Sequence, residues 1–399
     1  MTAAESLAQA RRGRWAIAAA FLMNGLLMGS WAIEIPQLLT RFKITESQLG
    51  LLIVVFGLGA LLMMPVSGML MAKHGSQRIL RLFGAACVAA LLPIAFAPNV
   101  PLLAVALFVL GGMTGCMDVA MNSNAVAVEK KLHKAIMSSS HGFWSLGGFI
   151  GGGVGGFAIQ HFGYLTHILG VTVVLGLMFA LIVGSIIPDE PHAAPTAEKQ
   201  PMRLPRTAAI YLVGVVALFA MIPEGAVMDW AAVYLQKGLG AEIATAGLAY
   251  SLFAGTMAVL RFMGDGVRNR FGAVLTMRVS SLIAAAGILV AALASDPWVA
   301  ILAFAFSGIG IANIVPIAFS AAGNQPGVAT TTGMSIVTTM GYSGILLAPS
   351  AIGFFAEHFG FPAVYIVLAG MLLVVCALAP LVRSADFKAT PPLPLPEGI

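Results

Sequence analysis

Twelve long apolar stretches divide this chain, and they restrict its possible folds more than any other feature of the sequence. Each is long enough to cross the roughly 30 Å hydrocarbon core of a bilayer as an α-helix, which rises about 1.5 Å per residue. These stretches lack the alternation of a barrel wall, and a helix satisfies its backbone amides within its own segment. The sequence therefore predicts an all-α membrane protein with twelve transmembrane helices. The predicted spans are 15–39, 48–71, 79–97, 101–127, 136–159, 163–187, 207–236, 243–263, 273–294, 298–320, 329–354 and 361–382.

The composition excludes a water-soluble globule. Of the 399 residues, 59% are apolar and only 9% are charged. Soluble domains carry about 25% charged residues, so this chain has too few to cover its surface against water. Lipid must replace water as the solvent of the outer surface, and the bilayer is an expected partner.

Basic residues gather on one side of the predicted topology. Of the 21 Lys and Arg, only Arg41, Lys43 and Lys237 fall in loops of the opposite side. Because basic loops stay in the cytoplasm, both termini are predicted to be cytoplasmic in a bacterial-type inner membrane. The net charge of +5 then reports topology and indicates no nucleic-acid partner. The first apolar stretch, from Trp15 to about Leu39, is too long for the core of a signal peptide, so we expect an uncleaved span.

The two halves of the chain resemble each other at an offset of 197 residues. The segment Gln160–Gly163 (QHFG) aligns with Glu357–Gly360 (EHFG). Single residues coincide at the same offset: Gly50 with Gly247, Phe56 with Phe253, Gly75 with Gly272, Arg81 with Arg278, and Gly111 with Gly308. Six spans per copy is an even number, so both copies enter the membrane from the same side, as in two-bundle transporters. The predicted organisation is an N-terminal bundle 1–187, a cytoplasmic linker 188–206, a C-terminal bundle 207–383 and a disordered cytoplasmic tail 384–399.

This arrangement, with basic turns after spans two and eight, resembles the major facilitator superfamily. Both turns carry much of the family pattern G-x-L-a-D-r-x-G. The matching residues are Gly68, Leu70, Lys73, Gly75, Arg270 and Gly272. The acidic position holds Ala72 in the first copy and Asn269 in the second, which puts the family's charge latch at these turns in doubt. The resemblance implies two six-helix bundles that form a transporter.

Three shorter stretches look similar to the fucose permease branch of this superfamily, whose members carry sugars together with protons. The matching residues are Asp118 and Asn122 in span four, His141–Gly147 at the start of span five, and Glu224, Trp230, Tyr234 and Leu235 in span seven. This resemblance implies a sugar or a related small polar solute as the substrate and a proton as the coupled ion.

Ionisable side chains within the spans are the candidates for proton coupling. A charged side chain at the centre of a membrane helix costs about 2.5–3.5 kcal/mol on insertion scales, so it needs a partner, a proton or water. The candidates are Asp118, His141, Glu34 and Glu224, with Asp229 as a substrate ligand. Counted from the loop ends, Asp118 and His141 lie near the cytoplasmic face and the other three in the outer halves. We therefore do not expect a single cluster of acids.

Asp118 and Asn122 are four residues apart and share a helix face, which Thr114 extends. A neutral carboxylic acid donates a hydrogen bond and an ionised one only accepts, so protonation of Asp118 changes what this polar stripe binds. The alternative is a static lock in which neighbouring hydroxyls or His141 satisfy Asp118.

Glu224 follows Pro223, which loosens the helix, and interrupted polar helices near the midplane are where transporter sites form. Asp229 lies about 140° further round the helix, so the two acids cannot share a face. Its alternative role is that of a rim residue solvated from outside.

Aromatic and neutral polar residues complete the predicted substrate site. Trp31 and Trp230, on symmetry-related spans, are candidates to stack a sugar ring across the bundle interface, or they belong to the aromatic belt at the membrane surface. Trp144 is a candidate cavity wall. Neutral hydrogen-bonding candidates are Asn313, Thr339 and Tyr342.

No catalytic triad, nucleotide loop or metal motif occurs in the short loops, so we expect no enzyme activity, no cofactor and a single chain as the working unit. The prediction is a secondary transporter with proton-coupled alternating access. The alternative is proton-driven efflux of amphipathic or cationic compounds. Gly142, Gly151 and Gly155 partly match the antiporter motif of drug exporters, but Gly156 replaces its proline. A membrane receptor is disfavoured because the loops leave no extramembrane domain.

Overall fold

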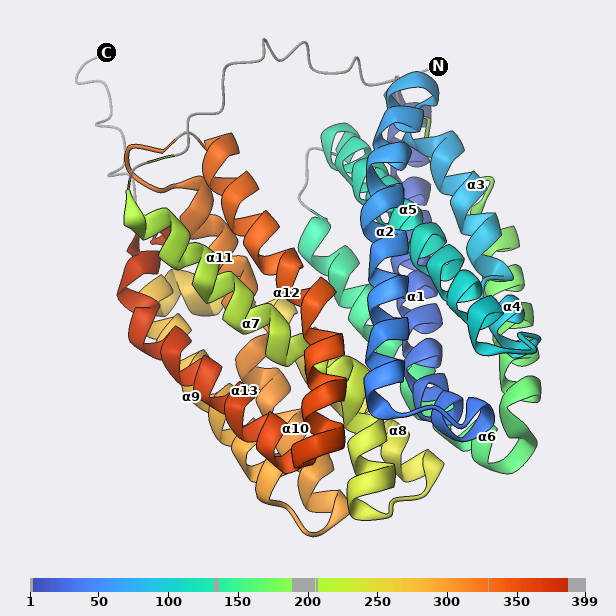
Figure 1. Cartoon of the computed structure of the whole chain (residues 1–399). Coiled ribbons are helices and arrows are strands. Elements are labelled where there is room, and N and C mark those ends of the chain that lie inside the picture. Colours follow the sequence, from blue (N-terminus) through green and yellow to red (C-terminus); the bar gives the residue numbers. More distant parts are fainter. Residues whose placement is uncertain (1–2, 133–135, 189–204, 206, 329, 387–399) are drawn as a thin grey trace.

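The computed structural model describes residues 3–132, 136–188, 205, 207–328 and 330–386 (Figure 1). Every regular element among them is a helix, and 11 helical segments are long and apolar enough to cross a membrane. The predicted class, an all-α membrane protein, is confirmed. Most of the predicted linker 188–206 and tail 384–399 lies outside the described residues.

The elements follow one another in chain order with short connections. They are α1 (Ala3–Phe42), α2 (Glu46–His74), α3 (Ser76–Val88), α4 (Leu92–Ala95), α5 (Val100–Leu132), α6 (Met137–Ile182), α7 (Ala208–Val233), the π-helix η1 (Tyr234–Gly238), α8 (Ile243–Phe271), α9 (Ala273–Leu293), α10 (Pro297–Ile311), α11 (Ile314–Gly323), α12 (Thr330–Phe359), α13 (Phe361–Leu378) and the 3₁₀-helix η2 (Ala379–Ala385).

Helix α6 joins the predicted spans 136–159 and 163–187 into one element that bends at Gly163. Gly163 has φ 82° and ψ 162°, which are not helical and which a residue with a Cβ rarely adopts. The first arm runs beside α1, and the second arm returns beside α3, where Arg81 donates to the carbonyl of Val183. The turn therefore needs a single glycine and no loop, which is why the structure has fewer separate spans than predicted.

Figure 1 shows two bundles, α1–α6 and α7–η2, that converge at the end away from the two termini. In the first bundle α1 packs on α6 and α2 on α5; in the second α7 packs on α12 and α9 on α10 and α13. The most extensive contacts between the bundles join α2 to α12 and α6 to α8. We call the end where α1 begins and η2 finishes the terminal face, and the other end the opposite face.

Glycines allow the closest helix contacts. A Cβ on Gly25 of α1 would lie 1.9 Å from the carbonyl oxygen of Trp144, and one on Gly151 would lie 2.5 Å from that of Leu26. On the other side of α6, a Cβ on Gly152 would lie 2.8 Å from the ring of Tyr250 in α8. Gly147 and Gly151 therefore face α1, whereas Gly148 and Gly152 face α8, and packing between helices explains both pairs.

Replacing Gly25 by Ala should lower the stability of the folded chain by about 1–3 kcal/mol, because the new methyl group separates α1 from α6. Gly170, in the second arm of α6, is the matched control, since nothing lies within 4 Å of its Cβ position. Gly170→Ala should keep or slightly raise stability because alanine favours helix. Thermal unfolding of both variants in detergent measures the difference, and equal melting temperatures would refute the packing role.

The backbone supports the proposed internal repeat. Gly75 and Gly272, which are 197 residues apart, have φ values of 80° and 78°. Gly163 and Gly360, at the same separation, both have φ 82°. Each pair occupies the same connection in its own bundle, after the second and the fifth predicted span.

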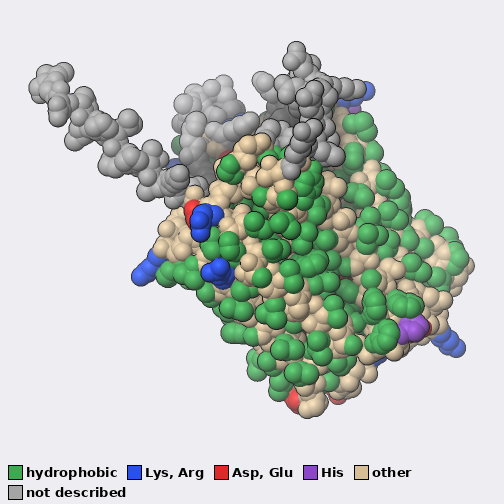
Figure 2. All heavy atoms as spheres, turned by 60° about the vertical axis from the view of Figure 1, so that its left-hand side comes forward, with side chains coloured by type: hydrophobic (Ala, Val, Ile, Leu, Met, Phe, Trp, Pro, Cys, Tyr) green, Lys and Arg blue, Asp and Glu red, His purple; other side chains and the backbone are tan. Residues whose placement is uncertain are grey.

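The surface matches a lipid environment. Figure 2 shows hydrophobic side chains over the middle of one face, with Lys, Arg, Asp, Glu and His toward its ends. Leu181, Leu293 and Leu347 are among the exposed apolar residues, at 81%, 68% and 66%. Such exposure is unfavourable in water and neutral in hydrocarbon.

Candidate functional site

A cleft of about 380 Å³ lies between the two bundles. Seven helices contribute to it: α1, α2, α5, α6, α7, α8 and α12. Its polar and aromatic lining residues are Asn24, Phe56, Thr114, Asp118, His141, Trp144, Glu224, Arg261 and Tyr342. The remaining lining is mostly aliphatic, so a few polar groups determine what the cleft binds.

Asp118 begins a polar chain across the N-terminal bundle. The Asn122 Nδ2 donates to Asp118 Oδ1 at 3.2 Å and to the Asp118 carbonyl at 2.9 Å. On its other side, Asn122 Oδ1 lies 3.2 Å from His141 Nε2. The predicted stripe of Asp118 and Asn122 is present, but His141 contacts Asn122 and no direct Asp118–His141 bond forms. The alternative of a lock made by a direct bond between Asp118 and His141 is therefore not seen in this conformation.

Glu224 pairs with Arg261, which was counted among the basic residues of the cytoplasmic side. Arg261 Nη2 donates to Glu224 Oε1 at 2.8 Å, and Arg261 Nη1 lies 3.3 Å from Ser145 Oγ of the other bundle. The side chain of Glu224 is only 16% exposed and that of Arg261 only 20%. Arg261 lies in α8 ten residues before its end, inside the apolar segment Ile243–Gly264, and that position was the signal that it is not a loop residue.

Trp144, the candidate for a cavity wall, lines the cleft. Its Nε1 donates to Asn24 Oδ1 of α1 at 2.8 Å, which fixes the indole. Tyr342 of α12 lines the cleft from the other bundle and is 44% exposed. Asn24 is a site residue that the sequence reasoning missed, because a lone Asn in an apolar helix carries no pattern.

The acids are arranged differently from the expectation. Asp118 and Glu224 belong to different bundles but line one cleft, although counting from loop ends placed them at different depths. Glu34 and Asp229 do lie apart from that cleft.

Trp31 and Trp230 do not line the cleft. Their side chains are 1% and 0% exposed, inside separate bundles. Trp31 stacks on Phe56 with ring centroids 6.1 Å apart, and Trp230 contacts Phe361 at 6.0 Å. The expected pair of tryptophans across the interface is therefore not formed in this conformation, and neither residue is exposed as an aromatic-belt residue would be.

Glu34 has a buried histidine as its partner. Its Oε1 lies 2.6 Å from His167 Nδ1, and the two side chains are 4% and 3% exposed. His167 comes from the second arm of α6, so the pair joins that arm to α1 within the N-terminal bundle. His167 was not among the predicted site residues, although it is a histidine inside the predicted span 163–187.

Three other predicted substrate residues lie away from the cleft. Asp229 lines a separate cavity of about 10 Å³ beside Trp230. Asn313 sits at the break between α10 and α11, where its side chain occupies the space beside Gly264. Thr339 is exposed on α12 and is not among the residues that line the cleft.

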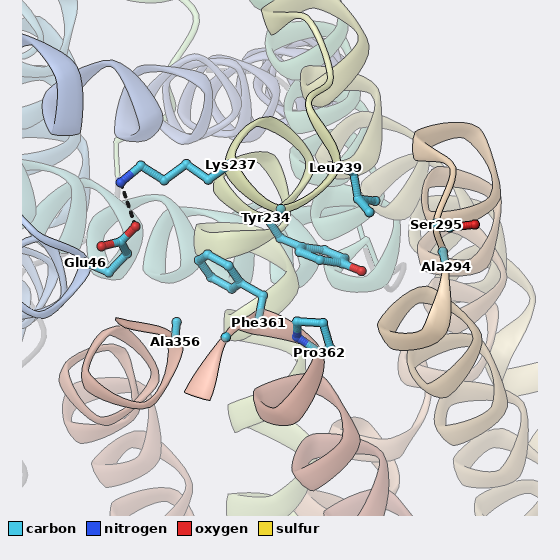
Figure 3. A pocket seen from close by; sticks show the side chains of 11 residues that line it. Glu46, Tyr234, Lys237, Leu239, Ala294, Ser295, Ala356, Phe361 and Pro362 are labelled. Carbon is cyan, nitrogen blue, oxygen red and sulfur yellow. Dashed lines mark hydrogen bonds and ion pairs between the residues drawn. The ribbon is translucent and has the colours of Figure 1, made fainter. Parts of the chain in front are cut away.

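The bundles are sealed at the opposite face. Lys237 Nζ of η1 lies 2.6 Å from Glu46 Oε1 of α2, and Figure 3 shows this pair at the edge of a surface pocket beside Tyr234 and Phe361. The hydrogen bond of Arg261 with Ser145 is the one nearest the terminal face among those that join the two bundles within the described residues.

Two further contacts of this seal follow the internal repeat. The backbone amide of Ser47, at the start of α2, donates to Glu357 Oε2 of α12. The amide of Ala244, at the start of α8, donates to Gln160 Oε1 of α6. Both donors and both acceptors are 197 residues apart, so each bundle caps a helix of the other in a symmetric manner.

The family model described as Major Facilitator Superfamily matches residues 16–324 and 213–397 of this sequence. The chain belongs to the major facilitator superfamily. An MFS-type transporter of Yersinia pestis, itself uncharacterized, is 36% identical over 366 residues, which cover 90% of this chain and 93% of that protein. This MFS protein is therefore a membrane transporter and not an enzyme, as the sequence predicted.

Solved structures of the superfamily share its fold. A mutant of the nucleoside transporter NupG superimposes with a TM-score of 0.77 at 12% identity, covering 92% of this chain and 99% of that one. The fucose:proton symporter FucP of E. coli gives a TM-score of 0.62 at 18% identity, covering 92% and 98%. These identities establish the MFS fold alone.

Proposed function

We propose that this transporter carries a small, neutral, polar solute such as a sugar across the inner membrane by proton-coupled alternating access. The observation that carries this proposal is the cleft between the bundles, which combines Asp118 of one bundle with Glu224 and Arg261 of the other. Charged side chains are rare in membrane helices and mark the paths of substrates and ions. The terminal face is the cytoplasmic one in this proposal, following the basic loops.

Asp118 is the better candidate for the proton carrier. Arg261 is the only Lys or Arg among the described residues that line the cleft, and its guanidinium already compensates Glu224 at 2.8 Å. Asp118 has a neutral amide as its partner. A carboxylate without a cationic partner in a membrane gains most from binding a proton.

A neutral hydroxylated solute matches the remaining groups. The Arg261–Glu224 pair offers donors and an acceptor side by side, which is what a hydroxyl group needs because it both donates and accepts. The anchored Trp144 supplies an aromatic surface for the apolar side of a ring. The Arg261–Glu224 pair is neutral overall and offers no net negative charge to a cation, so it does not favour the efflux alternative.

The sealed opposite face supports alternating access with this conformation open toward the cytoplasm. Breaking the symmetric caps at Ser47 and Ala244 would open the opposite face. The Arg261–Ser145 contact also joins the two bundles, and it lies between the seal and the terminal face. Two rigid bundles that rock about this centre then expose the cleft alternately.

A screen followed by transport tests this function. Thermal shifts of the purified protein against sugars, other neutral solutes, organic acids and cations identify the ligand. In proteoliposomes, a membrane potential of 100 mV on one proton supplies about 2.3 kcal/mol, or roughly fortyfold accumulation of a neutral solute. Accumulation should disappear when ionophores collapse both the pH gradient and the potential. Uptake that ignores both would exclude coupling and leave facilitated diffusion; stabilisation by cations alone would exclude the proposed solute class.

A further inference from the structure

A second pocket, of about 570 Å³, lies at the terminal face, where α1 begins, α5 ends and α6 begins. Its lining residues are Leu7, Arg11, Arg14, Trp15, Leu132, Ile136 and Ser139. None of them lines the cleft between the bundles, so this groove has no part in the proposed transport site.

Arg14 is held in place within this groove. Its Nη2 donates to Ser139 Oγ at 2.5 Å, and Ser139 Oγ in turn donates to the carbonyl of Ile136. The guanidinium carbon lies 5.8 Å from the ring of Trp15 and 5.7 Å from that of Phe143. Nη1 is buried in this conformation and has no hydrogen-bond partner among the described residues. The guanidinium is therefore oriented while part of its donor capacity is unused.

Arg11 adds a second guanidinium three residues earlier on the same face of α1, and it is exposed. No Asp or Glu is among the described residues that line the groove. Glu129 is the acid near the end of α5, and its carboxylate accepts a hydrogen bond from the amide of Ile136. Two guanidinium groups without a lining carboxylate favour an anion that accepts several hydrogen bonds.

The apolar borders of the groove identify the kind of anion. Trp15 is 67% exposed and Leu7 is 43% exposed, at the first turns of a helix that crosses the membrane. Trp prefers the level of the lipid headgroups, where one side is apolar and the other is wet. A ligand that fits must carry a negative charge at headgroup level and an apolar part directed into the bilayer.

We propose that this groove binds the phosphate of an anionic phospholipid, with Arg11 and Arg14 as hydrogen-bond donors. Trp15 and Leu132 contact the glycerol and the upper acyl chain. A zwitterionic lipid binds less well, because its ammonium group comes close to the two guanidinium groups. The expected contribution is about fivefold in affinity for each arginine near an anionic lipid surface.

Native mass spectrometry of the full chain with equal amounts of phosphatidylglycerol and phosphatidylethanolamine tests this site. Wild type should retain phosphatidylglycerol preferentially, and Arg11→Gln and Arg14→Gln should each lose about fivefold in its retention. Arg12→Gln is the matched control, since Arg12 is exposed on the same helical turn but does not line the groove. Equal losses in Arg12→Gln and Arg11→Gln would show attraction by general charge and overturn the site.

A second measurement protects the test against misfolding of the Arg14 variant. Phosphatidylglycerol with brominated acyl chains should quench Trp15 fluorescence, measured as the difference between wild type and Trp15→Phe. Arg11→Gln, whose exposed side chain is not needed for folding, should reduce that quenching, and brominated phosphatidylethanolamine should quench less in wild type. Equal quenching by the two lipids, or unchanged quenching in Arg11→Gln, would contradict the proposal.

Discussion

Asp118→Asn should abolish concentrative uptake while exchange of solute across the membrane continues. Asparagine keeps the size of the side chain and its contact with Asn122, but it cannot bind and release a proton. The solute then equilibrates without the driving force of the proton. At 100 mV, accumulation should fall from roughly fortyfold to none.

Counterflow and concentrative uptake, measured in the same proteoliposomes, separate these two properties. Asp229→Asn is the matched control, because Asp229 is also an acid within a membrane helix but lies outside the cleft. It should retain accumulation. If Asp118→Asn accumulates solute as wild type does, Asp118 is not the carrier, and Glu224→Gln becomes the next variant to measure.

Gly50→Leu should open the opposite face. A Cβ on Gly50 would lie 2.5 Å from the carbonyl oxygen of Pro349 and 3.0 Å from the Cα of Ser350, so a leucine cannot fit between α2 and α12 while that face is closed. Overpacking of this kind costs about 1–3 kcal/mol, and about 1.4 kcal/mol corresponds to tenfold in a conformational equilibrium. We expect about fivefold to a hundredfold more of the form that is open at the opposite face.

Spin labels at Lys43 of the first bundle and Ser295 of the second, both exposed at the opposite face, report this opening in pulsed electron resonance. Cys376 is replaced by Ser so that it does not take up a label. The distance between the labels should lengthen in Gly50→Leu and remain unchanged in Gly170→Leu, since nothing lies near the Cβ position of Gly170. A folded Gly50→Leu protein with the wild-type distance would show that this contact does not seal the transporter.

Whether a predicted site residue lies in the cleft depends on its type: the acids Asp118 and Glu224 line it, and the tryptophans Trp31 and Trp230 do not. An acid within a membrane helix is conspicuous because its desolvation is costly, and Asp118 and Glu224 were found in this way. Trp31 and Trp230 were assigned to a ligand because they are aromatic and symmetry-related, yet both fill the interiors of their bundles. An aromatic ring is equally favourable in a protein core, in lipid and in a binding site, so its type alone does not indicate its place.

Arg261 and His167 were not predicted as site residues, although both pair with candidate acids. Both lie in apolar helices and have acidic partners far away in the sequence, Glu224 and Glu34. No local pattern contains such a pair, because the partners are brought together only when the helices pack. Arg261 was counted only as one of the basic residues of the cytoplasmic side.

The sequence by itself determined the membrane class, the approximate spans and the family resemblance, because hydrocarbon tolerates only long apolar helices with satisfied backbones. Tertiary structure alone decided which side of each helix faces the cleft. In water an amphipathic stripe would mark the inner side, but here the lipid-facing and core-facing sides are both apolar. Close glycine contacts and a few charged pairs set the helix orientations instead, and these act between residues that are far apart in the chain.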